Sequence, residues 1–247
     1  MKSFIINKND ASQRLDKYLT KSFPNLPKAL MYKYIRLKRI KVNGKRAEIS
    51  TRLAVGDVVD MYINDEFFEK SETRYDFMSA SKNIDIIYED ENILLLNKKT
   101  GLLSHPDDNE YVDTLITRVK RYLYEKGEFR PDDENSFTPA LVNRIDRNTS
   151  GIVIAAKTAE ALRVLNQKMK DRELHKIYLC VIHGTPKEKS AVLEGYLVKD
   201  EKKNKVTVFH KPVEGGRTIK TEYKVLASKG EVSLLEVHLL TGRTHQI

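Results

Sequence analysis

The most informative stretch of this chain is Asn143-Arg144-Ile145-Asp146-Arg147-Asn148-Thr149-Ser150-Gly151. One carboxylate, Asp146, stands between the guanidinium groups of Arg144 and Arg147, and an apolar run over residues 152–156 follows directly. We therefore expect a loop that is anchored at one end in a buried strand. Nearby positive charge favours the ionised carboxylate, and an ionised, positioned aspartate can act as a nucleophile or as a base. A structural Arg–Asp pair at a turn is the alternative interpretation of the same residues.

The composition is that of a globular protein. The chain has 247 residues, of which 40% are hydrophobic, and this length allows one large domain or a small domain with a medium one. No apolar run approaches the roughly 20 residues of a membrane-spanning helix, and the N-terminal residues lack the pattern of a secretory signal. The single cysteine, Cys180, is expected to be an inert core residue. These features predict a cytoplasmic protein that does not act on membranes.

The net charge of +9 is unevenly distributed along the chain. Residues 12–64 hold twelve Lys or Arg and four Asp or Glu, a net charge of +8. Residues 65–80 have a net charge of −3, and residues 81–247 a net charge of +3. A solvated surface scatters its charges, whereas a local concentration of this kind indicates a site for a polyanion.

The basic segment also carries signals for secondary structure. Eight basic residues and no acid lie between residues 28 and 46: Lys28, Lys33, Arg36, Lys38, Arg39, Lys41, Lys45 and Arg46. Apolar residues interleave with them at helical spacing, which predicts an amphipathic helix with a basic outer face. A short helix before it has Asp10 or Ser12 as a possible cap. Asn43-Gly44 predicts a tight turn, and the alternation over residues 58–63 predicts a strand.

This order of elements resembles the alpha-L RNA-binding module of a small-subunit ribosomal protein and of several RNA-modifying enzymes. The resemblance rests on Arg14–Leu19, Ile40–Lys45 and Gly56-Asp57. Pro27-Lys28-Ala29 stands where such modules carry Ser-Arg, which removes a possible hydroxyl cap. The resemblance implies an RNA-binding domain over residues 12–64, whose expected contacts are Lys33, Arg36, Lys38, Arg39 and Lys45. A small α/β domain with a solvated basic face is the alternative.

A linker and a larger domain are expected after this module. Residues 65–82 are acidic and lack clear periodicity, so we interpret them as an interdomain linker. Residues 83–247 predict an α+β domain with a mainly antiparallel mixed sheet, two helices and several strands. Its strands are expected at 84–88, 93–97, 177–182, 191–198, 205–209, 218–227 and 232–240, and its helices at 111–126 and 158–172. The histidines are scattered and no cluster has the spacing of metal ligands, so no metal is expected.

Four segments of the larger domain occur together in one known family. They are residues 97–106, 143–151, Lys176-Ile177-Tyr178 and Thr241-Gly242-Arg243-Thr244-His245-Gln246-Ile247. Their order and spacing resemble the RluA/RluC/RluD-type pseudouridine synthases, and the likeness runs from about Arg14 to Ile247. The fused basic module is typical of members that act on large-subunit ribosomal RNA.

The resemblance implies the role of each site residue. Asp146 is the expected catalytic carboxylate, Tyr178 stacks on the uracil and assists proton removal, and Arg243 pairs with Asp146. Arg144 fills the space that a flipped nucleotide leaves. Lys176, Lys98 and His105 are expected near the RNA. Core packing of Tyr178 and a surface position of Arg243 are the alternatives when each residue is taken alone.

These roles predict an RNA uridine isomerase that needs no cofactor, because the reaction involves no redox change. The expected substrate is ribosomal RNA, with transfer RNA as a second candidate, and a monomer is expected. A non-catalytic RNA-binding or ribosome-associated protein is the main alternative function. A hydrolase using Asp146 as a base is another, but a metal-dependent one would need further carboxylates in place of Arg144 and Arg147.

Two features depart from the family pattern. Asn143 stands where the family motif usually has histidine, and it keeps hydrogen-bonding ability without becoming a cation. The sequence ends at Ile247, directly behind Arg243, whereas relatives continue for several strands. We therefore expect a truncated C-terminus, with lower stability and a loosely held Arg243.

Overall fold

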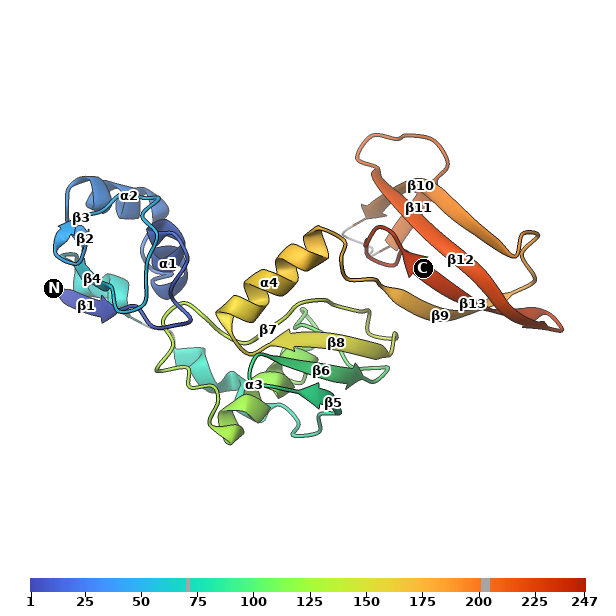
Figure 1. Cartoon of the computed structure of the whole chain (residues 1–247), viewed down its shortest axis with the longest axis horizontal. Helices are drawn as coiled ribbons and strands as arrows, with labels where there is room; N and C mark the ends of the chain where they lie inside the picture. The colour runs from blue at the N-terminus through green and yellow to red at the C-terminus, as the bar shows by residue number, and fades with distance from the viewer. Residues whose placement is uncertain (70–71, 201–204) are drawn as a thin grey trace. The chain divides into compact units, whose positions relative to one another are not determined.

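The computed structural model describes residues 1–69, 72–200 and 205–247, without the side chains of residues 72–74. The chain divides into two compact units, Met1–Asn166 and Gln167–Ile247. Helices and three sheets make up the fold, and all strand pairs among the described residues are antiparallel. The predicted α+β class is thus confirmed, with separate sheets rather than one (Figure 1).

The first unit begins with a small basic module. Its sheet has the order β1-β4-β2-β3, formed by Lys2–Ile5, Val58–Met61, Ile40–Val42 and Lys45–Arg46. Two helices, α1 (Leu15–Ser22) and α2 (Lys28–Arg36), lie in the same module. Its core also includes Ile6 and Ala11. The stretch before residue 12 therefore belongs to the sheet and core of this module.

The Asn43-Gly44 turn connects strands β2 and β3 and is bonded to residues 57 and 58. Both residues have positive φ, 52° and 70°, as a two-residue hairpin loop of type I′ requires. The Asn43 side chain donates to Asp57 Oδ1 at 2.9 Å and accepts a hydrogen bond from the Val58 amide at 2.8 Å. The turn and the Gly56-Asp57 pair are therefore bonded to each other, which explains why both occur in one pattern.

The expected cap of the first helix is wrong. The N-cap residue of α1 is Arg14, and no side chain caps the helix there. Asp10 does not reach this position because its carboxylate accepts hydrogen bonds from Asn135 and Ser136. The second helix ends near Leu37, where Lys38 adopts a left-handed φ of 61° and the Arg39 amide donates to Tyr34 O at 2.9 Å.

Aromatic side chains dock the segment that follows the module. Phe67 and Phe68, in the short helix η1 (Asp65–Phe68), pack against the core of the module. Phe77, in η2 (Glu72–Ser79), contacts the rings of Tyr124 and Phe129. Ser71, part of the predicted linker, lies outside the described residues.

The second sheet of the first unit has the order β5-β6-β8-β7. Its strands are Ile86–Glu89, Ile93–Lys98, Gly151–Ala156 and Ala140–Leu141. Helix α3 (Leu115–Lys126) begins after Thr114 with a capping box and ends at Gly127, whose φ is 81°. Alternate residues of β6 are buried, and the alternation Leu94-Leu96 continues to Lys98.

The second unit is dominated by one five-stranded sheet of order β11-β10-β12-β13-β9. The strands are Lys205–Phe209, Ser190–Asp200, Arg217–Lys229, Val232–Leu239 and Ile177–His183. Helix α4 (Ala159–Lys170) spans the boundary between the units, and the Thr158 hydroxyl accepts a hydrogen bond from the Ala161 amide at its start. Cys180, on β9, is half-buried rather than in the core. None of the described helices has the length and hydropathy needed to span a membrane.

Candidate active site

Asp146 lies on the loop between β7 and β8, and its side chain is exposed. The neighbouring Ile145 is buried, with 8% of its surface exposed, and anchors the loop. At the base of the loop, Asn143 Oδ1 accepts a hydrogen bond from the Ile154 amide at 2.8 Å and Nδ2 donates to Ile152 O at 3.3 Å. The carboxylate is therefore accessible, while the backbone that carries it is held on both sides.

A buried lysine ties this loop to the segment after β6. The Lys98 ammonium donates to Leu102 O at 2.7 Å, to Lys99 O at 3.1 Å and to Arg147 O at 3.1 Å. Lys98 has no exposed surface, and it lies opposite Gly151 in the β6–β8 pairing. Three hydrogen bonds satisfy the donors of an ammonium group, which explains how this charge is tolerated inside.

Two more contacts join the same pair of segments. The Ser104 hydroxyl donates to Ile145 O at 2.8 Å and accepts a hydrogen bond from the Ile145 amide at 3.3 Å. The Gly101 amide donates to Arg147 O at 2.9 Å, and Arg147 Nε donates back to Gly101 O at 3.0 Å. Residues on both sides of Asp146 are therefore fixed by one neighbouring loop. The sequence pattern held no signal for the role of Ser104.

The electrostatics of this group reflect burial among cations. Burial lowers the pKa of Lys98, and the nearby Asp146 carboxylate opposes this shift. Burial also lowers the pKa of His105, and the positive charges of Arg144 and Lys120 lower it further. The neutral imidazole is favoured as a result.

Lys98, which the family resemblance placed near the RNA, is buried beside the Asp146 loop. Its ammonium is enclosed and bonded to main-chain carbonyls, so it positions the Asp146 loop. The alternation Leu94-Leu96-Lys98 already placed it on the buried face of the strand. His105 is half-buried, and Arg144, two residues before Asp146, is exposed.

The remaining predicted site residues lie in the second unit. Tyr178 is on β9 and pairs with Val237 of β13. Arg243 is exposed on the turn after β13. The Gln246 side chain shapes that turn: its oxygen accepts a hydrogen bond from the Arg243 amide at 3.1 Å, and its nitrogen donates to Lys220 O at 3.1 Å. The Thr241 and Gln246 side chains are also bonded to each other, at 3.0 Å.

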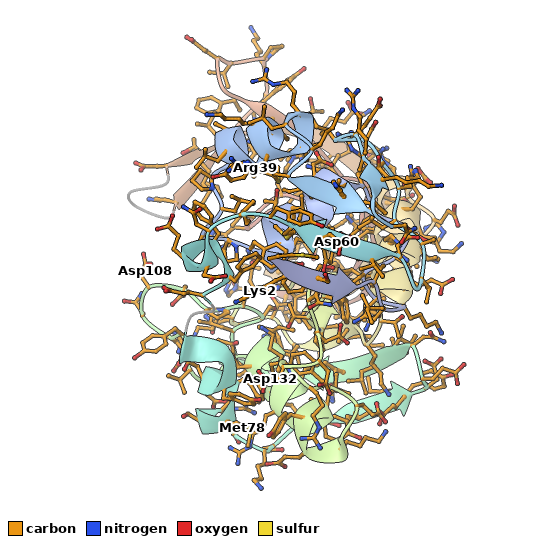
Figure 2. All side chains as sticks on the ribbon, turned by 90° about the vertical axis from the view of Figure 1, so that its left-hand side faces the viewer. Lys2, Arg39, Asp60, Met78, Asp108 and Asp132 are labelled. Carbon is orange, nitrogen blue, oxygen red and sulfur yellow. The ribbon has the colours of Figure 1, made fainter. Side chains whose placement is uncertain are left out.

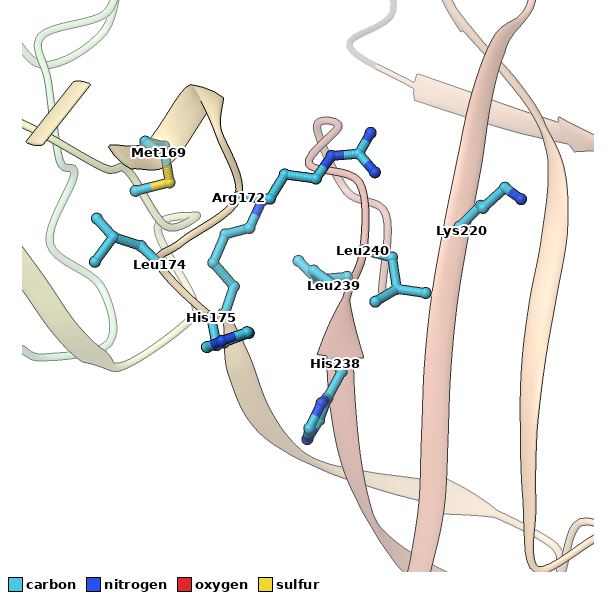
Figure 3. A pocket seen from close by; sticks show the side chains of 9 residues that line it. Met169, Arg172, Leu174, His175, Lys220, His238, Leu239 and Leu240 are labelled. Carbon is cyan, nitrogen blue, oxygen red and sulfur yellow. The ribbon is translucent and has the colours of Figure 1, made fainter. Parts of the chain in front are cut away.

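A pocket of about 250 Å³ opens beside this turn (Figure 3). Basic residues contribute to its lining, and they are Arg172, His175, Lys176, Lys220 and His238. Burial lowers the pKa of Lys176, and the nearby positive charges of Arg172 and Arg243 add to the shift. A side chain at Gly242 would meet the Lys176 ammonium at 2.9 Å, so the glycine allows this close approach.

The predicted site residues thus form two groups. Arg144, Asp146, Lys98 and His105 lie in the first unit, and Lys176, Tyr178 and Arg243 lie in the second. The structure defines the geometry of each group separately. Within the first group, hydrogen bonds join Lys98 to the loop of Asp146; within the second, Lys176 lies next to the turn of Arg243.

The predicted RNA contacts of the basic module are all exposed: Lys33, Arg36, Lys38, Arg39 and Lys45. The guanidinium of Arg39 lies 5.7 Å from the centre of the Tyr34 ring, and Figure 2 shows Arg39 near the end of α2. A cation stacked on an aromatic ring is held in place while its charge stays accessible. Among the described residues, no group of histidine, cysteine or acidic side chains is arranged to hold a metal ion.

Comparison with protein families gives two matches. Residues 92–247 match the family described as RNA pseudouridylate synthase, and residues 13–59 match the S4 domain. The first match covers the Asp146 loop and the Arg243 turn, and the second covers α1, α2 and the Asn43-Gly44 turn.

Curated relatives are similar over nearly the whole chain. An uncharacterized RNA pseudouridine synthase of Mycoplasma genitalium is 32% identical over 99% of this chain and 76% of its own length. The ribosomal large subunit pseudouridine synthase D of Borreliella burgdorferi is 32% identical over 100% of this chain and 73% of its own. The ribosomal large subunit pseudouridine synthase C of Vibrio vulnificus is 31% identical over 98% and 73%.

A solved structure shares the fold. The human RNA pseudouridylate synthase domain-containing 4 protein superposes with a TM-score of 0.52 at 19% identity, over 66% of this chain and 61% of that chain. This likeness concerns the arrangement of the backbone.

Proposed function

The chain belongs to the RNA pseudouridylate synthase family, and from this premise we propose that it isomerises uridines of large-subunit ribosomal RNA to pseudouridine. The family matches show that the chain is an RNA pseudouridine synthase with an S4 domain. The choice of ribosomal RNA is our inference, supported by the names of relatives from Borreliella and Vibrio.

The reaction sets clear demands on the site. The bond between uracil N1 and ribose C1′ breaks, and C5 of the base joins C1′ instead. The proton that leaves C5 balances the proton that N1 gains, so no electron donor or acceptor is needed. A uridine within folded RNA must first leave the base stack, which costs a few kcal/mol.

We assign the central role to Asp146. The observation that supports it best is that its carboxylate is exposed on a loop held by Lys98, Ser104 and Asn143. A fixed and accessible carboxylate favours a reaction that depends on orientation. Arg144, exposed two residues earlier, is assigned to the space that the flipped nucleotide leaves. Tyr178 and Arg243 are assigned to the base and to Asp146, by the family motifs that they match.

Pseudouridine mapping tests this proposal. The protein is incubated with ribosomal RNA and with transfer RNA transcripts, and new pseudouridines are located by chemical mapping. Asp146→Asn should abolish product while RNA affinity stays nearly unchanged, because the substitution removes one charge and keeps the shape. Asp108→Asn, an exposed acid of the first unit, is the matched control and should keep activity. Modification of transfer RNA alone would refute the ribosomal target, and an active Asp146→Asn variant would refute the catalytic role.

We further propose how the chain is organised for this task. Residues 12–64 bind RNA, residues 65–82 connect the two domains, and residues 83–247 carry out the isomerisation. The protein acts as a monomer, without a metal ion, in the cytoplasm. Activity after treatment with a chelator, light scattering of the purified protein and cell fractionation test these points separately. A loss of activity on chelation that added metal restores would contradict the metal-free reaction.

A further inference from the structure

A cluster of polar side chains connects the basic module to the segment that carries Asp146. Asp10 lies at its centre and has no exposed surface. Its Oδ1 accepts hydrogen bonds from the Ser136 amide at 3.0 Å and from the Ser136 hydroxyl at 2.6 Å, and its Oδ2 accepts one from Asn135 Nδ2 at 2.8 Å. All these residues belong to the first compact unit.

Residues close to Asp10 in sequence form further hydrogen bonds, both to residues 134–136 and to α4. Asn9 Nδ2 donates to Glu134 Oε1 at 2.7 Å, and Gln13 Nε2 donates to Ser136 Oγ at 2.7 Å. On the other side, Asn9 Oδ1 accepts a hydrogen bond from the Ala159 amide at 3.1 Å, at the start of α4. Arg163 of the same helix donates to Ala11 O at 3.3 Å.

The partners of this cluster flank the catalytic segment. Residues 134–136 precede β7, and residues 159–163 follow β8, so they lie on either side of the loop that holds Asp146. Residues 9–13 lead directly into α1 of the basic module. A short stretch of chain therefore joins the module to both ends of the segment that presents the catalytic carboxylate.

The chemistry of the contact favours a fixed geometry. A buried carboxylate is costly unless it is hydrogen-bonded, and charge-assisted hydrogen bonds are short and directional. An apolar contact of equal size would let the two segments slide against each other. The hydrogen bonds, in contrast, require one relative position of residues 9–13 and residues 134–136. The hydrogen bonds from Asn135 and Ser136 satisfy the Asp10 carboxylate and fix its orientation.

We propose that Asp10 is a positioning residue that determines which uridine is modified, by holding the basic module at a set distance from Asp146. This inference rests on the proposed function. An RNA bound by its phosphates to the module then presents to Asp146 only a uridine at the matching distance. Asp10 touches no reacting atom, and its effect on the reaction is exerted through this geometry.

Activity on two RNAs of different length tests the proposal. The long RNA spans both the module and the modified uridine, and the short stem-loop carries the uridine but does not reach the module. In the full-length chain, Asp10→Asn should lower kcat/KM on the long RNA about tenfold, the change that corresponds to about 1.4 kcal/mol, and should add pseudouridine at neighbouring positions. The kcat on the short stem-loop should be unchanged. Equal losses on both RNAs, or an unchanged site and rate, would overturn the proposal.

Two further variants separate positioning from folding. Asp10→Asn combined with Asn135→Asp exchanges donor and acceptor, restores the hydrogen bond and should recover the original site. Ser136→Ala keeps the backbone amide bond to Asp10 and removes only the hydroxyl, so it tests the contact if Asp10→Asn does not fold. It should shift the site in the same direction with a smaller loss; unchanged fidelity of a folded Ser136→Ala variant would count against the proposal.

A distance measurement makes the test independent of activity. Spin labels are placed at Glu48→Cys and Glu160→Cys, both exposed positions of the first unit, in a Cys180→Ser background. The labelled parent should give one narrow distance distribution, and Asp10→Asn should broaden it. A broad distribution in the parent overturns the inference even if the protein is active. If no RNA is modified, the proposed function fails while the narrow distribution can still stand.

Discussion

At the scale of single residues, Lys98 shows how a buried ammonium group can hold two loops together. Burial of an ammonium group costs several kcal/mol unless its protons are all donated, and Lys98 donates to the carbonyls of Lys99, Leu102 and Arg147. These carbonyls belong to two loops that extend beyond the end of the β6–β8 pairing. The cation thus substitutes for a strand pairing at the place where the sheet ends and the Asp146 loop begins.

Replacement of this cation should destabilise the protein. Lys98→Met keeps the length of the side chain but removes the ammonium that the carbonyls of Lys99, Leu102 and Arg147 share, so the free energy of unfolding should fall by about 2–3 kcal/mol. Urea unfolding measures the change. Lys99→Met is the matched control, because Lys99 is exposed and bonded to Asp85 at 2.6 Å, and surface ion pairs contribute at most about 1 kcal/mol. Equal losses in the two variants would contradict the role of Lys98.

The environment of His105 makes stability depend on pH. Its folded pKa is lowered by burial and by Arg144 and Lys120, whereas the unfolded chain takes up the proton near pH 6.5, the ordinary value. The unfolded state then binds more protons as the pH falls below that value, and stability is lost. His105→Gln should reduce the drop in Tm between about pH 7.5 and about pH 5.5. His183→Gln, at an exposed position of β9, should leave the drop unchanged, and an equal effect of both substitutions would rule out His105 as the source.

At the scale of elements, the end of α2 and the hairpin beside it present the basic surface. The left-handed Lys38 ends the helix and turns the chain toward β2. Lys33 and Arg36 are exposed on the last turns of the helix, and Lys45 follows the hairpin turn. Short elements with tight ends thus place several cations within one small module without any acid between residues 28 and 46.

RNA affinity should therefore depend strongly on salt. Each phosphate contact adds roughly 0.7–0.9 to the slope of log K against log salt concentration. Neutralisation of four cations should flatten that slope by roughly 2–3 if most of them contact phosphates, and these are Lys33, Arg36, Lys38 and Arg39. Filter binding at several salt concentrations measures it. A control variant neutralises four exposed lysines of the second unit, namely Lys187, Lys189, Lys205 and Lys211. A slope that changes more in the control would place the RNA contacts outside the module.

At the scale of the whole molecule, the features that could be predicted are those set by neighbours in sequence. The hairpin turn at Asn43-Gly44 depends on two adjacent residues, and the structure confirms it. The motif around Asp146 indicated a loop ahead of a buried strand for the same reason. Fold class followed from the sum of such local patterns.

What could not be predicted depends on contacts between distant residues. Asp10 looked like a helix cap, but its partners lie about 126 positions away. Ser104 is bonded to Ile145, 41 positions later, and no local pattern distinguishes it from other serines. The family resemblance placed Lys98 near the RNA, but it did not indicate the hydrogen bonds to the carbonyls of Lys99, Leu102 and Arg147 that enclose the ammonium group.

The Asn43-Gly44 turn has a chemical consequence for the lifetime of the protein. In a flexible chain, an asparagine before glycine loses ammonia when the following amide nitrogen attacks its side chain, and the ring that forms opens to aspartate or isoaspartate. Here the side-chain amide of Asn43 is held by Asp57 and by the Val58 amide, and the attack requires these bonds to break. The rate of deamidation at Asn43 should therefore report how often the hairpin opens locally. Peptide mass spectrometry after storage, with a urea-unfolded sample as the reference, would show slower conversion in the folded protein; equal rates would mean that the turn opens freely.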